Sequence, residues 1–171
     1  MDGKMLPIKP LCLTALPQEP LISVLIANYN YGNYIGKALS SILRQTYQNF
    51  EVIVCDDGST DNSVAVIQSY VERDPRVRLI VKNNGGVASA LNRAFTEAHG
   101  HIVTLLDADD TWFPSRLETI VKLFGQRPTP GMVMHPLQVV DGKGRVLKDK
   151  HPARLVGGWL APALARGEHP S

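Results

Sequence analysis

Apolar residues along the chain alternate between short continuous runs and segments with helical spacing. The runs are rich in β-branched residues, which is typical of strands buried on both faces of a sheet, and they cover 21–27, 50–55, 77–81 and 101–106. After each run, apolar residues recur every three or four positions, which predicts a helix. Four strand–helix repeats with short connections predict an α/β fold with three layers and a mostly parallel sheet.

The third helical segment follows a turn at 83–86 and carries one clear apolar stripe. The stripe consists of Val87, Leu91, Ala94, Phe95 and Ala98. We expect this stripe to face the sheet, because a helix that covers a sheet buries its apolar side.

The pattern divides the chain into three parts. Prolines interrupt residues 1–20, which we interpret as a flexible leader. Residues 21–125 hold the repeats and form the predicted α/β domain. The pattern weakens over 126–171, where a hairpin at 139–146 is the clearest feature.

Composition excludes several classes of protein. Lys and Arg total 18 against 16 Asp and Glu, a formal net charge of +2, which argues against a nucleic-acid partner bound through a basic face. Two cysteines cannot build a disulfide framework, and no apolar run approaches the roughly 18 residues of a spanning helix. We therefore expect a cytoplasmic location, with peripheral contact to the cytoplasmic face of a membrane as an open alternative.

Candidate chemistry gathers just beyond three of the predicted strands. Ligands of open parallel sheets bind past the carboxyl ends of the strands, where the strand order reverses. With the common order 3-2-1-4, residues 27–30, 56–58 and 107–110 would share one crevice, and two of these tips carry paired acids. Crowded carboxylates need a positive neutraliser, and Mg²⁺ or Mn²⁺ with phosphate as a further ligand suits oxygen donors. The sequence therefore indicates a metal–phosphate site.

The same tips, in this order and spacing, resemble glycosyltransferase family 2. The resemblance is carried by Ser23-Val24-Leu25-Ile26 with Asn28-Tyr29-Asn30, by Val54-Cys55-Asp56-Asp57-Gly58-Ser59-Thr60-Asp61, and by Leu105-Leu106-Asp107-Ala108-Asp109-Asp110. It extends over roughly residues 21–125. It implies a Rossmann-like fold of GT-A type that binds a nucleotide-sugar, often UDP-linked, together with a divalent metal.

The resemblance also implies where the nucleoside would lie. Ala27, Asn28 and Tyr29 would line the nucleobase, and Asp57 would accept a hydrogen bond from the base, with Asp56 beside it. Two softer candidates fall where the family often keeps an Asn-X-Gly and a later asparagine; they are Asn84 and Asn92.

The Asp-X-Asp motif of the family matches Asp107-Ala108-Asp109. By the resemblance this motif touches the ribose and holds the metal on the diphosphate, with Asp109 and Asp107 as metal ligands and Asp110 sharing in the ligation. A metal there would stabilise the charge that the leaving diphosphate gains during sugar transfer.

A general base is not identifiable. In inverting members of the family it lies well after the Asp-X-Asp motif, where this chain offers only Glu118, Asp141, Asp149 and Glu168, none in a recognisable base motif. We therefore expect only the donor half of a transferase, whose acceptor is an unknown saccharide, lipid-linked sugar or protein. A nucleotide-sugar-binding module without catalysis stays an alternative.

Plainer interpretations stay open for both acidic motifs. Residues 56–61 suit a turn and helix cap, and 107–110 suit an acidic loop. Leu105 to Thr111 also fits the strand and Asp-X-Asp-X-Thr motif of haloacid dehalogenase type phosphatases. That motif usually opens its domain and needs a later acidic pair, whereas here it comes two thirds along the chain.

Overall fold

The computed structural model describes residues 15–126, 133, 137–141 and 144–150. Internal contacts divide the chain into two compact units, Met1–Thr129 and Pro130–Ser171, which are described separately. Of the predicted leader, residues 1–14 lie outside the described residues. Residues 15–20 belong to the first unit, where Tyr47 Oη donates a hydrogen bond to the Pro20 carbonyl (2.7 Å).

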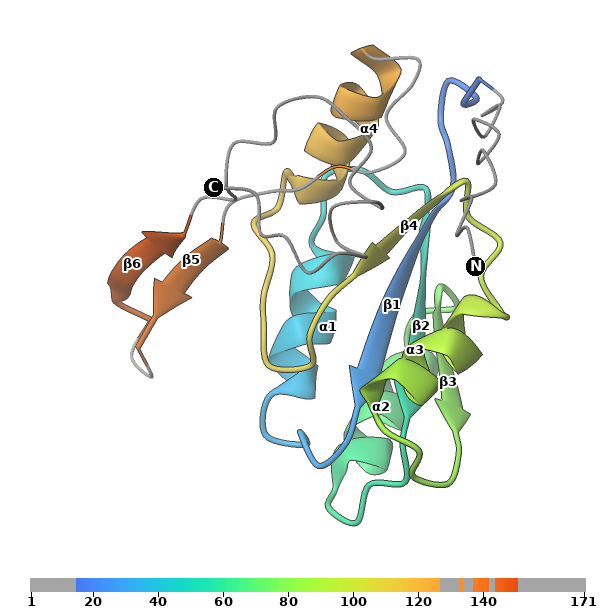
Figure 1. Cartoon of the computed structure of the whole chain (residues 1–171), viewed down its shortest axis with the longest axis vertical. Helices are drawn as coiled ribbons and strands as arrows, with labels where there is room; N and C mark the ends of the chain where they lie inside the picture. Colours follow the sequence, from blue (N-terminus) through green and yellow to red (C-terminus); the bar gives the residue numbers. More distant parts are fainter. Residues whose placement is uncertain (1–14, 127–132, 134–136, 142–143, 151–171) are drawn as a thin grey trace, which may run out of the picture. The chain divides into compact units, whose positions relative to one another are not determined.

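The first unit is built on a four-stranded, fully parallel sheet (Figure 1). Its strands are β1 (Ile22–Asn28), β2 (Phe50–Asp56), β3 (Val77–Val81) and β4 (Ile102–Leu105), in the order β3-β2-β1-β4. Both the strands and their order agree with the sequence prediction. β1 is central, pairing with β2 on one side and β4 on the other, and it is almost wholly buried because both of its faces are covered.

Helices cover both faces of this sheet. They are α1 (Ile35–Leu43), α2 (Ser63–Val71), α3 (Val87–Phe95) and α4 (Arg116–Gln126). Apolar side chains of α1, α2 and α4 join one core cluster, whereas α3 packs on the opposite face against β1 and β2 (Figure 1). The predicted three-layer arrangement is therefore confirmed.

The inner face of α3 differs from the prediction. Val87 and Phe95 are 65% and 59% exposed, while Ala90 and Ala94 are buried against the sheet. Small side chains allow the helix axis to lie close to the strands, and the bulkier residues are left on its flanks. The expectation that Val87 and Phe95 face the core is wrong.

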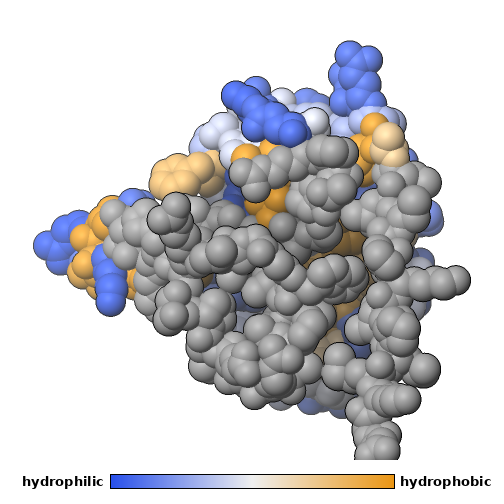
Figure 2. All heavy atoms as spheres, turned by 45° about the horizontal axis from the view of Figure 1, so that its top comes forward, coloured by the Kyte–Doolittle hydropathy of each residue, from blue (hydrophilic) through white to orange (hydrophobic). Residues whose placement is uncertain are grey.

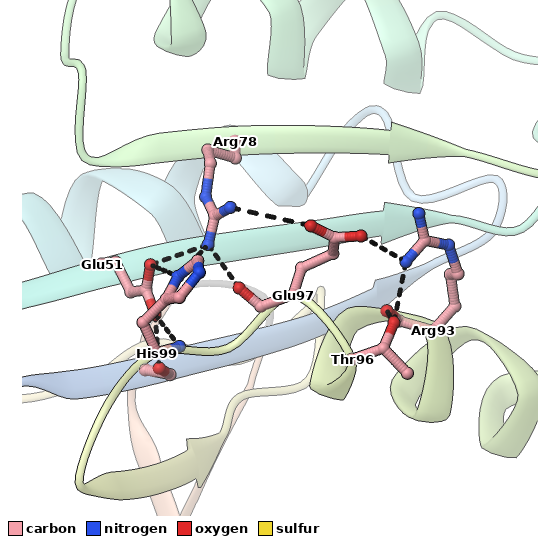
Figure 3. A network of polar contacts seen from close by, with 7 residues as sticks. Glu51, Arg78, Arg93, Thr96, Glu97 and His99 are labelled. Atoms are coloured by element: carbon pink, nitrogen blue, oxygen red, sulfur yellow. Dashed lines mark hydrogen bonds and ion pairs between the residues drawn. The ribbon is translucent and has the colours of Figure 1, made fainter.

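A polar network joins the amino-terminal ends of the strands (Figure 3). Glu51 accepts hydrogen bonds from Ser23 Oγ (2.6 Å), the His99 backbone N–H (2.7 Å) and Arg78 (2.7 Å). Burial alone would raise the pKa of Glu51, but these hydrogen bonds and the Arg78 charge lower it below its ordinary value. The network fixes the strand ends on the edge opposite to the candidate site.

The second unit contains the predicted hairpin. β5 (Leu137–Val140) pairs antiparallel with β6 (Val146–Lys150), and Arg145 Nε donates to Asp141 Oδ2 (2.8 Å) across the turn. Apolar side chains remain exposed on it, visible as orange atoms at the left of Figure 2, and they are Leu137, Val140, Val146 and Leu147. Within the described ranges, every helix falls short of the length and apolarity that a membrane crossing requires.

Candidate active site

Hydrogen bonds between backbones bring the predicted tips together at the carboxyl edge of the sheet. The Asp57 N–H donates to the Asn28 carbonyl (2.8 Å), and the Leu106 N–H donates to the Leu25 carbonyl (3.1 Å). The end of β1 thus lies between the segments that follow β2 and β4 (Figure 1). Two strand spacings separate those segments, about 10 Å. A nucleoside diphosphate can span such a distance.

Asn28, Asp56 and Ser59 form a buried cluster on the β1–β2 side of this edge. Asp56 is fully buried and accepts from Asn28 Nδ2 (2.7 Å), Ser59 Oγ (2.7 Å) and the Ser59 N–H (2.8 Å). These contacts are those of a turn, which is the plainer interpretation given above for this motif. The Asp56 carboxylate therefore holds the two strand ends in place.

One acceptor in this cluster has no donor. Asn28 is 1% exposed, and its Oδ1 lacks a hydrogen-bond partner among the described residues. An unpaired buried polar atom costs about 1–3 kcal/mol, so an N–H or O–H group from a ligand would bind favourably there. Asn28 therefore combines a structural contact through Nδ2 with a free acceptor at the proposed site.

Asn30 shapes the same edge; sequence reasoning placed it in the crevice but assigned it no individual role. Its φ of 59° lies in the left-handed region, and Oδ1 accepts from the Thr60 N–H (2.8 Å). Asparagine tolerates this conformation better than most residues, which is the one sequence signal that could have identified the position. Asn30 ties the loop after β1 to the loop before α2.

Asp57 holds the loop after β3. It is 2% exposed, and its oxygens accept from Lys82 Nζ (2.6 Å), the Gly85 N–H (3.0 Å) and the Gly86 N–H (2.7 Å). The hydrogen bond from Lys82 is the main reason why the pKa of Asp57 lies below its ordinary value. Because these donors use most of the carboxylate's acceptor sites, a base N–H would have to share or replace one of them. The role of Asp57 at the nucleobase stays a prediction.

The two carboxylates of the Asp-X-Asp segment, on the β4 side, differ from the buried, hydrogen-bonded Asp56 and Asp57. Asp107 and Asp109 are exposed, and neither side chain contacts a partner in the described part of the chain. Ala108 is buried in the main core cluster, and the Asp110 N–H donates to the Asp107 carbonyl (3.1 Å). The buried alanine and this turn anchor the segment and leave both carboxylates facing solvent.

The carboxylates of the Asp-X-Asp segment fit a hard divalent cation whose remaining ligands come from the bound substrate. Within the described ranges, no group of three or more His, Cys, Asp or Glu side chains could hold a metal, so Asp107, Asp109 and Asp110 do not close a site on their own. Mg²⁺ and similar ions are commonly bound by one or two carboxylates together with substrate phosphates. Two unpaired carboxylates match that requirement.

The remaining predicted residues lie around this edge with less definite geometry. Tyr29 is 46% exposed, and Ala27 is half-buried against the core on the α3 side. Asn84 lies in the loop held by Asp57, and Asn92 lies on α3; both are exposed.

No general base emerges among the described acids after the Asp-X-Asp segment. Glu118 accepts from Thr46 Oγ1 (2.8 Å), and Asp141 pairs with Arg145 within the hairpin. The side chain of Asp149 and all of Glu168 lie outside the described residues.

Comparisons with known proteins agree with this geometry. An uncharacterised glycosyltransferase of Nostoc sp. is 42% identical over 127 residues, which cover 74% of this chain and 39% of that protein. The hyaluronan synthase of Pasteurella multocida is 42% identical over 144 residues, 84% of this chain and 14% of the synthase. The chain thus spans well under half the length of these curated relatives.

Solved structures show the same fold. A Pyrobaculum calidifontis mannosyltransferase in complex with GDP-Man and Mn²⁺ matches with a TM-score of 0.55 at 33% identity, covering 66% of this chain and 34% of that one. Staphylococcus aureus TarS in complex with UDP-GlcNAc matches with a TM-score of 0.58 at 28% identity, covering 61% and 31%. The GT-A fold is confirmed.

The family model for glycosyl transferase family 2 matches residues 23–163. This range includes residues 105–111, on which the phosphatase hypothesis rested, and that hypothesis is therefore rejected. With most of its length matched, the chain belongs to glycosyl transferase family 2.

Proposed function

We propose that this chain binds the donor in a metal-dependent glycosyl transfer from a nucleotide-sugar. The transfer is a single, inverting displacement: the acceptor oxygen bonds to the anomeric carbon as the bond from that carbon to the diphosphate breaks, and the proton of the acceptor hydroxyl passes to a general base. The observation that carries the proposal is the contrast across β1. Asn28 and Asp57 are buried and hydrogen-bonded on one side, and Asp107 and Asp109 are exposed, unpaired carboxylates on the other.

Charge explains why these two sides would act together. A diphosphate repels bare carboxylates, so Asp107 and Asp109 can face it only across a cation. When Mn²⁺ or Mg²⁺ is bound, it supplies electrostatic stabilisation of the leaving diphosphate. Asp109 and Asp107 would hold it, while the orphan Oδ1 of Asn28 would accept a hydrogen bond from the nucleoside.

The nucleotide is the finer part of the proposal. We propose a UDP-linked donor, with a GDP-linked donor as the direct competitor, because the two similar solved proteins hold UDP-GlcNAc and GDP-Man respectively. The acceptor stays open between a saccharide, a lipid-linked sugar and a protein, and the site of action is the cytoplasm or the cytoplasmic face of a membrane.

Isothermal titration calorimetry tests the donor site. UDP and GDP are titrated into the full chain with Mn²⁺ and, separately, with EDTA. We expect saturable binding that needs Mn²⁺, is tighter for UDP, and weakens at least about tenfold in Asp109→Asn. Glu72→Gln removes an equal charge from an exposed position at the end of α2 and serves as the matched control. Binding that is unchanged by EDTA or by Asp109→Asn would contradict the proposal.

A binding module without catalysis is the second candidate, and it is favoured by the missing general base among the described acids. Release of UDP from UDP-sugars, measured by a coupled assay, separates the two. Metal-dependent binding without UDP release indicates a module, whereas UDP release that Asp109→Asn abolishes indicates a transferase.

A further inference from the structure

A concavity runs along α1, and its lining includes Thr111, which follows the acidic segment 107–110 directly in the chain. Its volume is about 520 Å³, within the range of small-molecule sites. We call it the α1 groove, and its defining residues are Lys37, Ser40, Arg44, Tyr70, Thr111 and Trp112. The lining contains no Asp or Glu, but the Asp61 carboxylate accepts a hydrogen bond from the N–H of Gly32, a further lining residue (2.9 Å).

Two cations of the groove have no compensating acid. Lys37 and Arg44 are seven positions apart, so they lie on one side of the helix, about 10 Å apart along its axis. In the described part of the chain neither forms an ion pair. Most of the chain's other described arginines pair with an acid, as Arg76 does with Asp74 (2.7 Å). At Lys37 and Arg44 the groove therefore carries positive charge that no described acid pairs with, and this charge favours an anion.

The hydroxyl groups of Ser40 and Tyr70 in the groove already donate their hydrogens but can still accept hydrogen bonds. Tyr70 Oη donates to the Gly36 carbonyl (2.8 Å), so the contact between Ser40 Oγ and Tyr70 Oη (2.7 Å) must be donated by Ser40. Ser40 Oγ is left as an acceptor. A ligand composed of acceptors only would satisfy the two cations and leave this oxygen unpaired. A ligand with its own O–H donors satisfies both.

Trp112 adds an aromatic surface. The Arg116 guanidinium lies 4.9 Å from the centre of the indole ring, and the Trp112 backbone N–H donates to Ser41 Oγ (3.1 Å). The first contact orients the ring, and the second holds the Trp112 backbone beside α1. A fixed aromatic ring offers the C–H faces of a sugar an apolar surface.

We propose that the α1 groove binds an acidic saccharide, that is, a sugar ring that carries a carboxylate or a phosphate. The acid group pairs with Lys37 and Arg44, the sugar hydroxyls donate to Ser40 Oγ, and the ring lies against Trp112. This site uses none of the donor-site carboxylates and does not depend on a metal, although its lining residue Thr111 lies only two positions after Asp109.

Trp112 fluorescence reports binding directly. Trp159→Phe removes the second tryptophan, and the full chain is then titrated with four probes: glucose 6-phosphate, glucuronic acid, glucose and inorganic phosphate. We expect saturable changes with one or both acidic sugars and far weaker ones with glucose and phosphate. The two acidic sugars distinguish a phosphate from a carboxylate as the preferred acid group. Equal responses to glucose, or equal binding of inorganic phosphate, would overturn the proposal.

Charge-matched variants locate the site. Lys37→Gln with Arg44→Gln should weaken acidic-sugar binding about tenfold, whereas Lys122→Gln with Lys148→Gln, two lysines outside the groove, should leave it unchanged. Both pairs should bind UDP with Mn²⁺ as the parent does, so failure here is distinct from failure of the donor site. Equal weakening by both pairs, or binding only to phosphatidylglycerol vesicles and to no sugar, would overturn the assignment.

Discussion

The two sides of the candidate active site carry similar residues and behave in opposite ways. Asp56 and Asp57, after β2, are buried and accept hydrogen bonds from their own chain. Asp107 and Asp109, after β4, are exposed and have no partner in the described part of the chain. One acidic pair builds the edge of the sheet, and the other is left available to a cation.

This difference gives the two sides of a donor site separate roles, one in holding its shape and one in binding the metal. A carboxylate that already holds backbone N–H groups keeps a pocket in shape before the ligand arrives, which lowers the entropy lost on binding. A carboxylate without partners keeps its charge for the metal and the diphosphate. Substitutions on the first side should therefore change stability, and substitutions on the second should change binding.

The largest loss of stability is expected from Asp56→Ala. The substitution removes the acceptor of Asn28 Nδ2, Ser59 Oγ and the Ser59 N–H, all in or next to the buried edge. Leaving these donors unpaired should lower the free energy of unfolding by about 3 kcal/mol, measured by urea denaturation. An effect below about 1 kcal/mol would mean that Asp56 does not hold the two strands together.

Two glycines at this edge provide a matched comparison of backbone strain and close packing. Both have a positive φ, 81° at Gly58 and 87° at Gly86. A Cβ at Gly58 would lie 3.1 Å from the Asn84 nitrogen and 3.2 Å from the Lys82 oxygen, whereas at Gly86 it meets nothing within 4 Å. We expect Gly86→Ala to cost about 1 kcal/mol through strain alone and Gly58→Ala about 2 kcal/mol. Equal losses in urea denaturation would argue that the contacts at Gly58 relax freely.

A smaller effect, dependent on pH, is expected at Asp57. Its pKa is lowered in the folded state, chiefly by Lys82, so its ionised form stabilises the fold at neutral pH. Asp57→Asn should cost about 1.5 kcal/mol at pH 7. That deficit should shrink as the pH falls below the ordinary value of 3.8, because the parent then loses its advantage.

Urea denaturation at several pH values measures this difference, with Glu72→Gln as a control that should follow the parent at every pH. A deficit that stays constant down to acid pH would show that the Asp57 charge does not stabilise the fold.

Much of this architecture could be predicted from the sequence because it depends on local patterns. The β-branched runs predict buried parallel strands, and the rule for carboxyl edges brings Asp57 and Asp107 to the same edge once the order 3-2-1-4 is assumed. The face of α3 could not be predicted in the same way. Of the predicted stripe, Leu91, Ala94 and Ala98 do pack against the sheet, but periodicity also selected the exposed Val87 and Phe95 and missed Ala90.

The different states of the two acidic pairs were also beyond the sequence. The acidic tips at 56–57 and 107–109 read alike in the sequence, and each follows an apolar run. Asp57 is saturated by Lys82, Gly85 and Gly86, which come more than twenty positions later and reach it only because β3 pairs with β2. Whether a carboxylate already accepts hydrogen bonds from its own chain depends on tertiary contacts, and the spacing of residues in the sequence does not reveal it.

The smallest effect on stability, and the sharpest test of the comparison, is expected at Asp109. Its side chain is exposed, so Asp109→Asn should change the free energy of unfolding by less than about 0.5 kcal/mol in the absence of metal. In the presence of Mn²⁺ and UDP the parent should gain stability from the bound ligand, and Asp109→Asn should gain far less. Thermal denaturation with and without these ligands measures both quantities on one sample. If Asp109→Asn destabilises the metal-free chain as much as Asp56→Ala does, the two sides of the edge do not differ in the way proposed.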